Sequence, residues 1–98
     1  MPLLDFAAIA EQLPDSWKST RLGQVGPARI KVLRMDEKAY EEETHDYNEG
    51  LLVIDGCLRL SIGDTHINVA AGQMYLVEAG TAHGVLAGSQ GTLVIIDV

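Results

Sequence analysis

Cysteine, proline, aromatic and basic residues are all scarce in this chain of 98 residues. The single cysteine excludes an intrachain disulfide and is typical of a reducing compartment. Only 7 basic residues stand against 14 acidic ones, and the resulting net charge of −7 repels phosphate backbones and anionic lipids. We therefore expect neither a nucleic-acid partner nor a membrane partner.

Long apolar runs and targeting signals are also lacking. No apolar run approaches the roughly 20 residues that a membrane-spanning helix needs. The first residues lack the basic region of a signal peptide, and Asp5 and Glu11 interrupt their apolar stretch. Together with the lone cysteine, these absences predict a cytoplasmic protein.

The residues that are abundant indicate one β-rich domain. Hydrophobic residues make up 47% of the chain, which is enough for a single core at this length. Ten glycines, and many Val, Ile and Leu residues in the second half, are typical of short strands joined by tight turns. Residues 28–98 are therefore expected to form an all-β sandwich or barrel, with residues 1–27 packed on it.

The first 27 residues predict a helix followed by an extended segment. Between residues 2 and 13, apolar residues recur at helical spacing, at Phe6, Ile9, Ala10 and Leu13. Pro14 then ends the helix. Trp17 is expected to begin the extended segment, with its ring as an anchor in the core or at an interface. The two glycines and the proline of residues 22–27 predict a loop.

Alternating or apolar segments between turn residues predict the strands of the barrel. The expected strands cover residues 28–35, 39–45, 51–54, 57–62, 65–69, 74–77, 82–86 and 92–98. Asp55-Gly56 is a hairpin signal between two of them. In the segment 39–45, alternation predicts that Tyr40 faces one side, and Glu43 and His45 the other.

Three ionisable side chains of one segment are expected to converge. Glu43 and His45 are two residues apart, so they project from the same face of a strand. Glu49 begins an apolar strand, so its side chain can return to the same interior. Burying such groups is costly unless a cation compensates them, and imidazole with carboxylate suits Mn, Fe, Zn or Ni. His83, just after a turn, is the fourth candidate.

The segment around these residues resembles the first motif of the cupin superfamily, G-x5-H-x-H-x3,4-E-x6-G. His45, Glu49 and Gly56 match the second half of that motif in register. Glu43 stands where the first histidine belongs, and Lys38, not a glycine, precedes it by five positions. The match therefore departs from the motif at one of the residues that ligate metal in the family.

A second segment resembles the second cupin motif, G-x5-P-x-G-x2-H-x3-N. Gly72, Gly80 and His83 match in register, whereas Glu78 replaces the proline and Ala87 the asparagine. The resemblance covers roughly residues 28–98 and is strongest with the small single-domain cupins. It implies a jelly-roll β-barrel of six to eight strands, with a short N-terminal helix outside the barrel and the ligands in the lumen.

The resemblance also implies the roles of the candidate residues. It carries over His45, Glu49 and His83 as metal ligands, and Glu43 by its location alone. A triad of two histidines and one carboxylate would leave open coordination positions. If Glu43 binds as well, the site is nearly neutral and a poorer Lewis acid for anionic substrates. A metal-free barrel with Glu43 facing solvent is the third interpretation.

Two functions follow from these interpretations. The first is a metal-dependent enzyme with oxygenase or isomerase chemistry on a small molecule in the barrel, with Glu43 as its catalytic general base. The second is a metal-free module that binds or senses a small molecule without catalysis, which the departures at Glu43, Glu78 and Ala87 favour. Resemblance to cupins implies a homodimer in either case. The sequence names no substrate.

Overall fold

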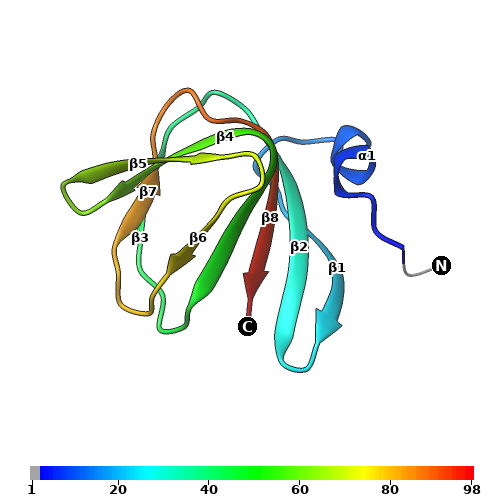
Figure 1. The fold of residues 1–98 in the computed structure, drawn as a ribbon, viewed down its shortest axis with the longest axis horizontal. Coiled ribbons are helices and arrows are strands. Elements are labelled where there is room, and N and C mark those ends of the chain that lie inside the picture. Colours follow the sequence, from blue (N-terminus) through cyan, green and yellow to red (C-terminus); the bar gives the residue numbers. More distant parts are fainter. Residues whose placement is uncertain (1–2) are drawn as a thin grey trace.

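The computed structural model describes residues 3–98, which form one short helix and eight strands (Figure 1). The elements are α1 (Phe6–Glu11), β1 (Thr20–Val25), β2 (Ala28–Met35), β3 (Tyr40–Glu43), β4 (Glu49–Ile62), β5 (Thr65–Ala70), β6 (Met74–Val77), β7 (His83–Val85) and β8 (Gln90–Asp97). The strand pairs are antiparallel, in the order β1-β2-β8-β4-β7-β3, with β5 and β6 also paired to β4. The prediction of an all-β fold with a short N-terminal helix is confirmed.

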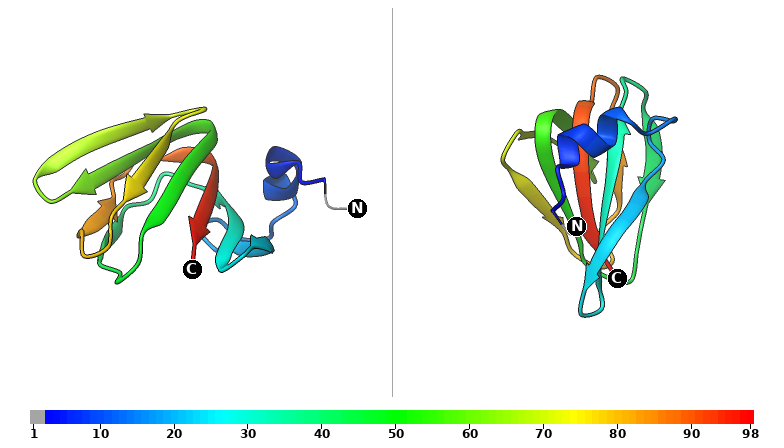
Figure 2. Two further views of the ribbon diagram at one scale, coloured as in Figure 1. Left: turned by 60° about the horizontal axis from the view of Figure 1, so that its bottom comes forward. Right: turned by 90° about the vertical axis from the view of Figure 1, so that its right-hand side faces the viewer.

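The long strand β4 belongs to two walls of the fold (Figures 1 and 2). Its first half pairs with β6 and β8, and its second half pairs with β5 and β7. The register against β8 shifts between Val53 and Asp55, where the strand turns the corner. The predicted hairpin at Asp55-Gly56 is therefore wrong, because these residues bend one continuous strand from the first wall to the second.

Two glycines allow this corner to form. Gly56 and Gly91 are paired across β4 and β8, with φ angles of 78° and 103°. A Cβ atom on Gly56 would run into the carbonyl oxygen of Gln90, and one on Gly91 would run into that of Asp55. Both positions therefore require glycine, for the backbone angle and for the close approach of the two strands.

The first wall, which contains β2, β8 and the first half of β4, is apolar on both faces. Its inner face contributes to the core between the walls, which consists of Leu33, Met35, Leu51, Val53, Leu58, Leu60, Val69, Val77 and Leu93. Its outer face carries Val32 and Val94, which pack with Ala10 of α1. Because neighbouring residues of a strand point to opposite faces, β2 alternates between the two layers.

One arginine adds polar contacts to the apolar packing between the helix and the first wall. The guanidinium Nη1 of Arg34 in β2 donates hydrogen bonds to the carbonyl oxygens of Ala10 and Leu13, at 3.0 and 2.7 Å. At the other end, the Asp5 carboxylate accepts a hydrogen bond from the backbone N–H of Ala8, so the helix begins after residue 5. The predicted helix, residues 2–13, is longer than α1, and its first residue, Pro2, lies outside the described residues.

The loop predicted for residues 22–27 is wrong. Strand β1 runs through Val25 and pairs with β2, and the chain reverses at Gly26. The pairing of β1 with β2 shifts register between Arg21 and Gly23, and the strand continues through this first glycine of the segment. Among residues 3–98, no helix has the length and apolar character required to cross a membrane.

Candidate functional site

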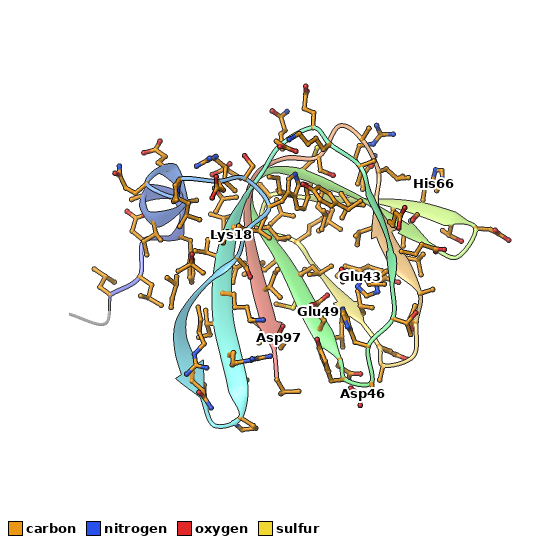
Figure 3. The ribbon with its side chains drawn as sticks, turned by 180° about the vertical axis from the view of Figure 1, so that it is seen from behind. Lys18, Glu43, Asp46, Glu49, His66 and Asp97 are labelled. Atoms are coloured by element: carbon orange, nitrogen blue, oxygen red, sulfur yellow. The ribbon has the colours of Figure 1, made fainter. Side chains whose placement is uncertain are left out.

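A cavity of about 240 Å³ opens between the two walls. Much of its lining is aliphatic, from Leu33, Leu51, Leu58, Leu60, Leu93 and Ile95. The carboxylates of Glu43 and Glu49 and the imidazole of His83 also line it. Figure 3 shows Glu43 and Glu49 near one another on different strands, whereas His66 lies apart on β5. The cavity therefore combines an apolar interior with one ionisable group of side chains.

Strands β3 and β7 bring two of the predicted residues together. Glu43 is paired with His83, and Tyr40 with Val85, so two residues of β3 lie opposite the single residue between these pairs on β7. This bulge interrupts the alternation of faces. Tyr40 and Glu43 consequently line the same cavity, and the prediction that they face opposite sides is wrong.

Glu43, His45 and His83 form a compact group of potential metal ligands. One ligand atom from each lies within 4.8 Å of the others. Nε2 of His45 is 3.2 Å from Oε2 of Glu43, and the two imidazole centroids are 5.3 Å apart. The sequence placed these imidazoles 38 positions apart, and the fold makes them neighbours.

Further contacts fix the position of His45. Its ring stacks on Tyr47 with centroids 4.9 Å apart and planes 10° apart. Its carbonyl oxygen accepts a hydrogen bond from the backbone N–H of Gly80 at 2.8 Å, and Asn48 Oδ1 accepts one from Ala79 at 2.8 Å. The loop that carries His45 is thereby attached to the turn that precedes His83.

His83 and Glu49 form a second, buried contact. Nε2 of His83 lies 3.4 Å from Oε1 of Glu49, and the two side chains are only 7% and 11% exposed. Nδ1 of His83 is 3.0 Å from the carbonyl oxygen of Thr81, which can only accept a hydrogen bond. The proton of a neutral His83 therefore lies on Nδ1, and the lone pair of Nε2 points toward the carboxylate.

Two facing acceptors need a proton or a cation between them. A histidine that ligates a metal commonly donates its other N–H to a backbone carbonyl, as His83 does to Thr81. Two imidazole nitrogens and one or two carboxylate oxygens form a donor set that suits first-row divalent metals. The residues present therefore fit a metal ion at this position.

The electrostatics of Glu49 support the same conclusion. Burial raises the pKa of Glu49, and positive charge on His83 and His45 opposes this rise. The buried Asp97 raises the pKa further, although its own charge is compensated by Lys31 at 2.8 Å and Arg29 at 3.3 Å. An ionised Glu49 is thus costly unless a positive charge lies beside it.

Glu43 differs from the other candidates in its exposure. Its side chain is 68% exposed, although its carboxylate contacts His45 and lines the cavity. Glu49 is absent from the group with mutual distances within 4.8 Å, but it contacts His83 directly. The site therefore offers one solvent-accessible carboxylate and one buried carboxylate on either side of the imidazoles.

The sequence did not identify an aromatic pair at the rim of this cavity. The rings of Trp17 and Tyr40 lie 4.9 Å apart at 49° and both line the cavity. Trp17 donates its backbone N–H to the carbonyl oxygen of Arg34 at 2.8 Å and its indole N–H to Asp36 at 2.5 Å. With a φ of 60°, Trp17 does not begin an extended segment, so that prediction is wrong. Its anchoring role against the core is confirmed.

The pKa of Asp36 reflects this attachment. The backbone N–H of Lys38 lowers the pKa most, and the indole of Trp17 lowers it further. The ionised carboxylate therefore holds the indole and the following turn together. No signal in the sequence relates Trp17 to Tyr40, because their contact depends on the left-handed backbone of one residue and the bulge beside the other.

Comparisons with known proteins agree with this architecture. A family model for the cupin domain matches residues 32–98. A cupin-2 domain containing protein from Shewanella frigidimarina is similar in structure, with a TM-score of 0.88 and 22% identity over 97% of this chain and 93% of that one. A protein from Neisseria meningitidis gives a TM-score of 0.84 and 15% identity over 98% of both chains.

A third similar structure is that of a hydroquinone 1,2-dioxygenase in complex with Cd2+ and 4-hydroxybenzonitrile. Its TM-score is 0.81 at 15% identity, over 99% of this chain and 72% of that one. At such identities, these likenesses show the fold alone. Comparison with curated proteins finds no match.

Proposed function

Because the chain belongs to the cupin domain family, we propose that it holds a divalent metal ion in its cavity and binds or converts a small molecule there. The observation that carries this proposal is the meeting of Glu43, His45 and His83 within 4.8 Å, beside the buried carboxylate of Glu49. A cation at this point would compensate the facing acceptors and the buried charge. The family membership makes a ligand site inside the barrel the natural location.

The proposed ligands are His45 and His83 with one or both carboxylates. Glu43 belongs to the compact group and is accessible to solvent, whereas Glu49 is buried against His83. Iron, manganese, zinc and nickel all accept such mixed nitrogen and oxygen donors. We propose that Glu49 completes the set that Glu43, His45 and His83 begin.

The proposed chemistry is that of an oxygenase or an isomerase. A bound ion would supply Lewis acidity or redox chemistry at the edge of the cavity. If His45, His83 and Glu49 hold the ion, Glu43 would be free to act as the general base, since its exposed carboxylate lines the cavity and can reach a proton of a bound molecule. The dioxygenase among the similar structures is consistent with this class, although only its fold is shared.

The second candidate function is a binding module without metal. The observation that favours it is the contact between Glu43 and His45, at 3.2 Å, because a protonated imidazole there would satisfy the carboxylate without an ion. The solvent exposure of Glu43 is consistent with this arrangement. In that case the cavity would still bind a small molecule, and neither histidine would retain metal.

A thermal denaturation experiment separates the two functions. A metal present at about 100 times its dissociation constant adds about 2.7 kcal/mol to the free energy of unfolding. The metal-binding proposal predicts that Mn, Fe(II), Zn or Ni raises the melting temperature of the chelator-treated protein, and that His45→Ala and His83→Ala abolish the increase. His66→Ala is the matched control, because His66 is exposed on β5 away from the site. No shift with any of these metals would favour the metal-free module.

We further propose that the protein is cytoplasmic and forms a homodimer without nucleic-acid or membrane partners. The lone cysteine supports a cytoplasmic location. The acidic net charge supports the absence of nucleic-acid and membrane partners. Exposed apolar side chains at Met74, Leu76 and Val98 support association with another copy.

A further inference from the structure

The only basic group in the cavity lining, among the residues that the structure describes, is the imidazole of His83, which already contacts Glu49. Glu41, Glu43 and Glu49 supply three carboxylates, and among the residues that the structure describes no lysine or arginine lines it. The cations of the neighbouring strand β2 are already engaged, since Lys31 and Arg29 both contact Asp97. An anionic molecule entering the cavity would therefore meet like charge and find no free cationic partner.

A divalent ion would not reverse this balance. Its two positive charges would be matched by Glu43 and Glu49, and Glu41 would remain as a further carboxylate of the lining. The cavity is therefore expected to disfavour anionic molecules in both the metal-free and the metal-bound protein.

The size of the cavity restricts its ligand to about one ring. Its volume of about 240 Å³ lies below the range of pockets for drug-sized ligands, which begin at about 300 Å³. An apolar cavity of roughly 150 Å³ accepts benzene, so a single ring with a small substituent fits. The aliphatic side chains of the lining favour an apolar body.

The rim adds a preference for a flat molecule. Trp17 is fixed by its backbone and indole hydrogen bonds, so its ring is held at the edge of the cavity before a ligand arrives. Tyr40 packs against it at 4.9 Å. Aromatic faces stack on rings and attract cations, whereas carboxylates gain nothing from them.

We propose that this cavity selects neutral or cationic molecules of about one aromatic ring and discriminates against anions, with Trp17 and Tyr40 as the stacking surface. The inference rests on the proposed function insofar as the cavity is the ligand site. It goes beyond that function because it assigns the substrate class and two specificity-determining residues.

The chain provides its own reporter for a test. Trp17 is the only tryptophan, so changes in intrinsic tryptophan fluorescence report on the cavity rim alone. Benzyl alcohol, benzylamine and benzoate form a matched series of one ring carrying no charge, a positive charge or a negative charge. Each is titrated into chelator-treated protein at constant ionic strength, with isothermal calorimetry as a second measurement.

The expected result is binding of benzyl alcohol and benzylamine with Kd values of about 1 mM or lower, and binding of benzoate at least about tenfold weaker. Tyr40→Leu should weaken the first two probes about tenfold through the loss of the stacking partner. Tyr75→Leu is the control, because Tyr75 lies outside the cavity lining and packs against the core. Circular dichroism verifies that both variants are folded.

Equal or tighter binding of benzoate would overturn the inference, as would the absence of binding of any probe by both methods. The outcome is separate from that of the proposed metal site. Selective probe binding by a protein that takes up no metal would retain the inference and refute metal binding. Metal binding without selective probe binding would support the metal site and refute the inference on ligand selectivity.

Discussion

His83 and Glu49 meet inside the barrel with a nitrogen and an oxygen acceptor 3.4 Å apart. The hydrogen bond from Nδ1 of His83 to the carbonyl oxygen of Thr81 determines this arrangement, because it leaves only the lone pair of Nε2 for Glu49. In the absence of metal, a proton must be shared between the two side chains. The pH dependence of stability should therefore report on this contact.

The first prediction concerns Glu49→Gln in metal-free protein. Burial raises the pKa of Glu49 above its ordinary value of 4.5, so the folded protein holds this proton more tightly than the unfolded chain does. Stability from this group is complete below pH 4.5 and is lost as the pH rises toward the raised pKa. The variant should therefore be more stable than the wild type at pH 7, with the difference shrinking toward pH 4, as measured by melting temperatures across this range.

The exposed Glu78 provides the control for this comparison. Glu78→Gln removes one negative charge on the turn before β7 and should give no comparable dependence on pH. If Glu49→Gln instead loses stability relative to the wild type as the pH rises, an ion pair with protonated His83 dominates, and the argument from burial is incorrect.

The second prediction concerns the corner of β4. Gly56→Ala should reduce the free energy of unfolding by about 3 kcal/mol, because the added methyl group meets the backbone at Gln90 and the backbone angle is unfavourable. Chemical denaturation measures this change. Gly72→Ala is a matched control, since Gly72 also has a positive φ, of 85°, but has open space around the added methyl group.

The control should cost only about 1–2 kcal/mol, the price of the left-handed backbone alone. Equal losses for the two variants would mean that the close approach of Gly56 and Gly91 contributes nothing. The difference between them therefore isolates the steric requirement of the corner.

The third prediction concerns the attachment of α1. Arg34→Met should cost about 2 kcal/mol, because it removes both charged hydrogen bonds to the end of α1 while keeping the aliphatic stem. Limited proteolysis should then cut the N-terminal segment faster than the barrel. Arg21→Met, at an exposed position of β1, is the control, and an unchanged cleavage rate for Arg34→Met would show that apolar packing alone holds the helix.

The fourth prediction concerns assembly. Light scattering of the purified protein at about 10 μM should give twice the mass of the chain, if the exposed apolar side chains of β6 are covered by a second copy. A monomer at this concentration would contradict the proposed homodimer.

Periodicity and motif spacing predicted most of the fold. The strands after residue 50 and the approximate position of the helix follow from local patterns that tertiary packing reinforces. The hairpin at Asp55-Gly56 failed because this dipeptide fits a tight turn and a strand corner equally well. Only the approach of Gly91, 35 residues later, selects the corner.

The site was predicted in part. Strand alternation alone predicted that Glu43 and His45 share a face, whereas the resemblance to the cupin motifs supplied Glu49 and His83 as partners. The role of the carbonyl oxygen of Thr81 could not be predicted, since backbone partners leave no mark in a sequence. The rim was missed because the contact between Trp17 and Tyr40 depends on an unusual backbone angle and a bulge.

The metal content of the protein tests the central claim most directly. Purified protein is stripped with a chelator, reloaded with Mn, Fe(II), Zn or Ni, desalted and measured by elemental analysis. We predict about one equivalent per chain for the wild type and for His66→Ala, and a loss of most of it for His45→Ala and His83→Ala. Less than about a tenth of an equivalent in the wild type with every metal would contradict the proposed site.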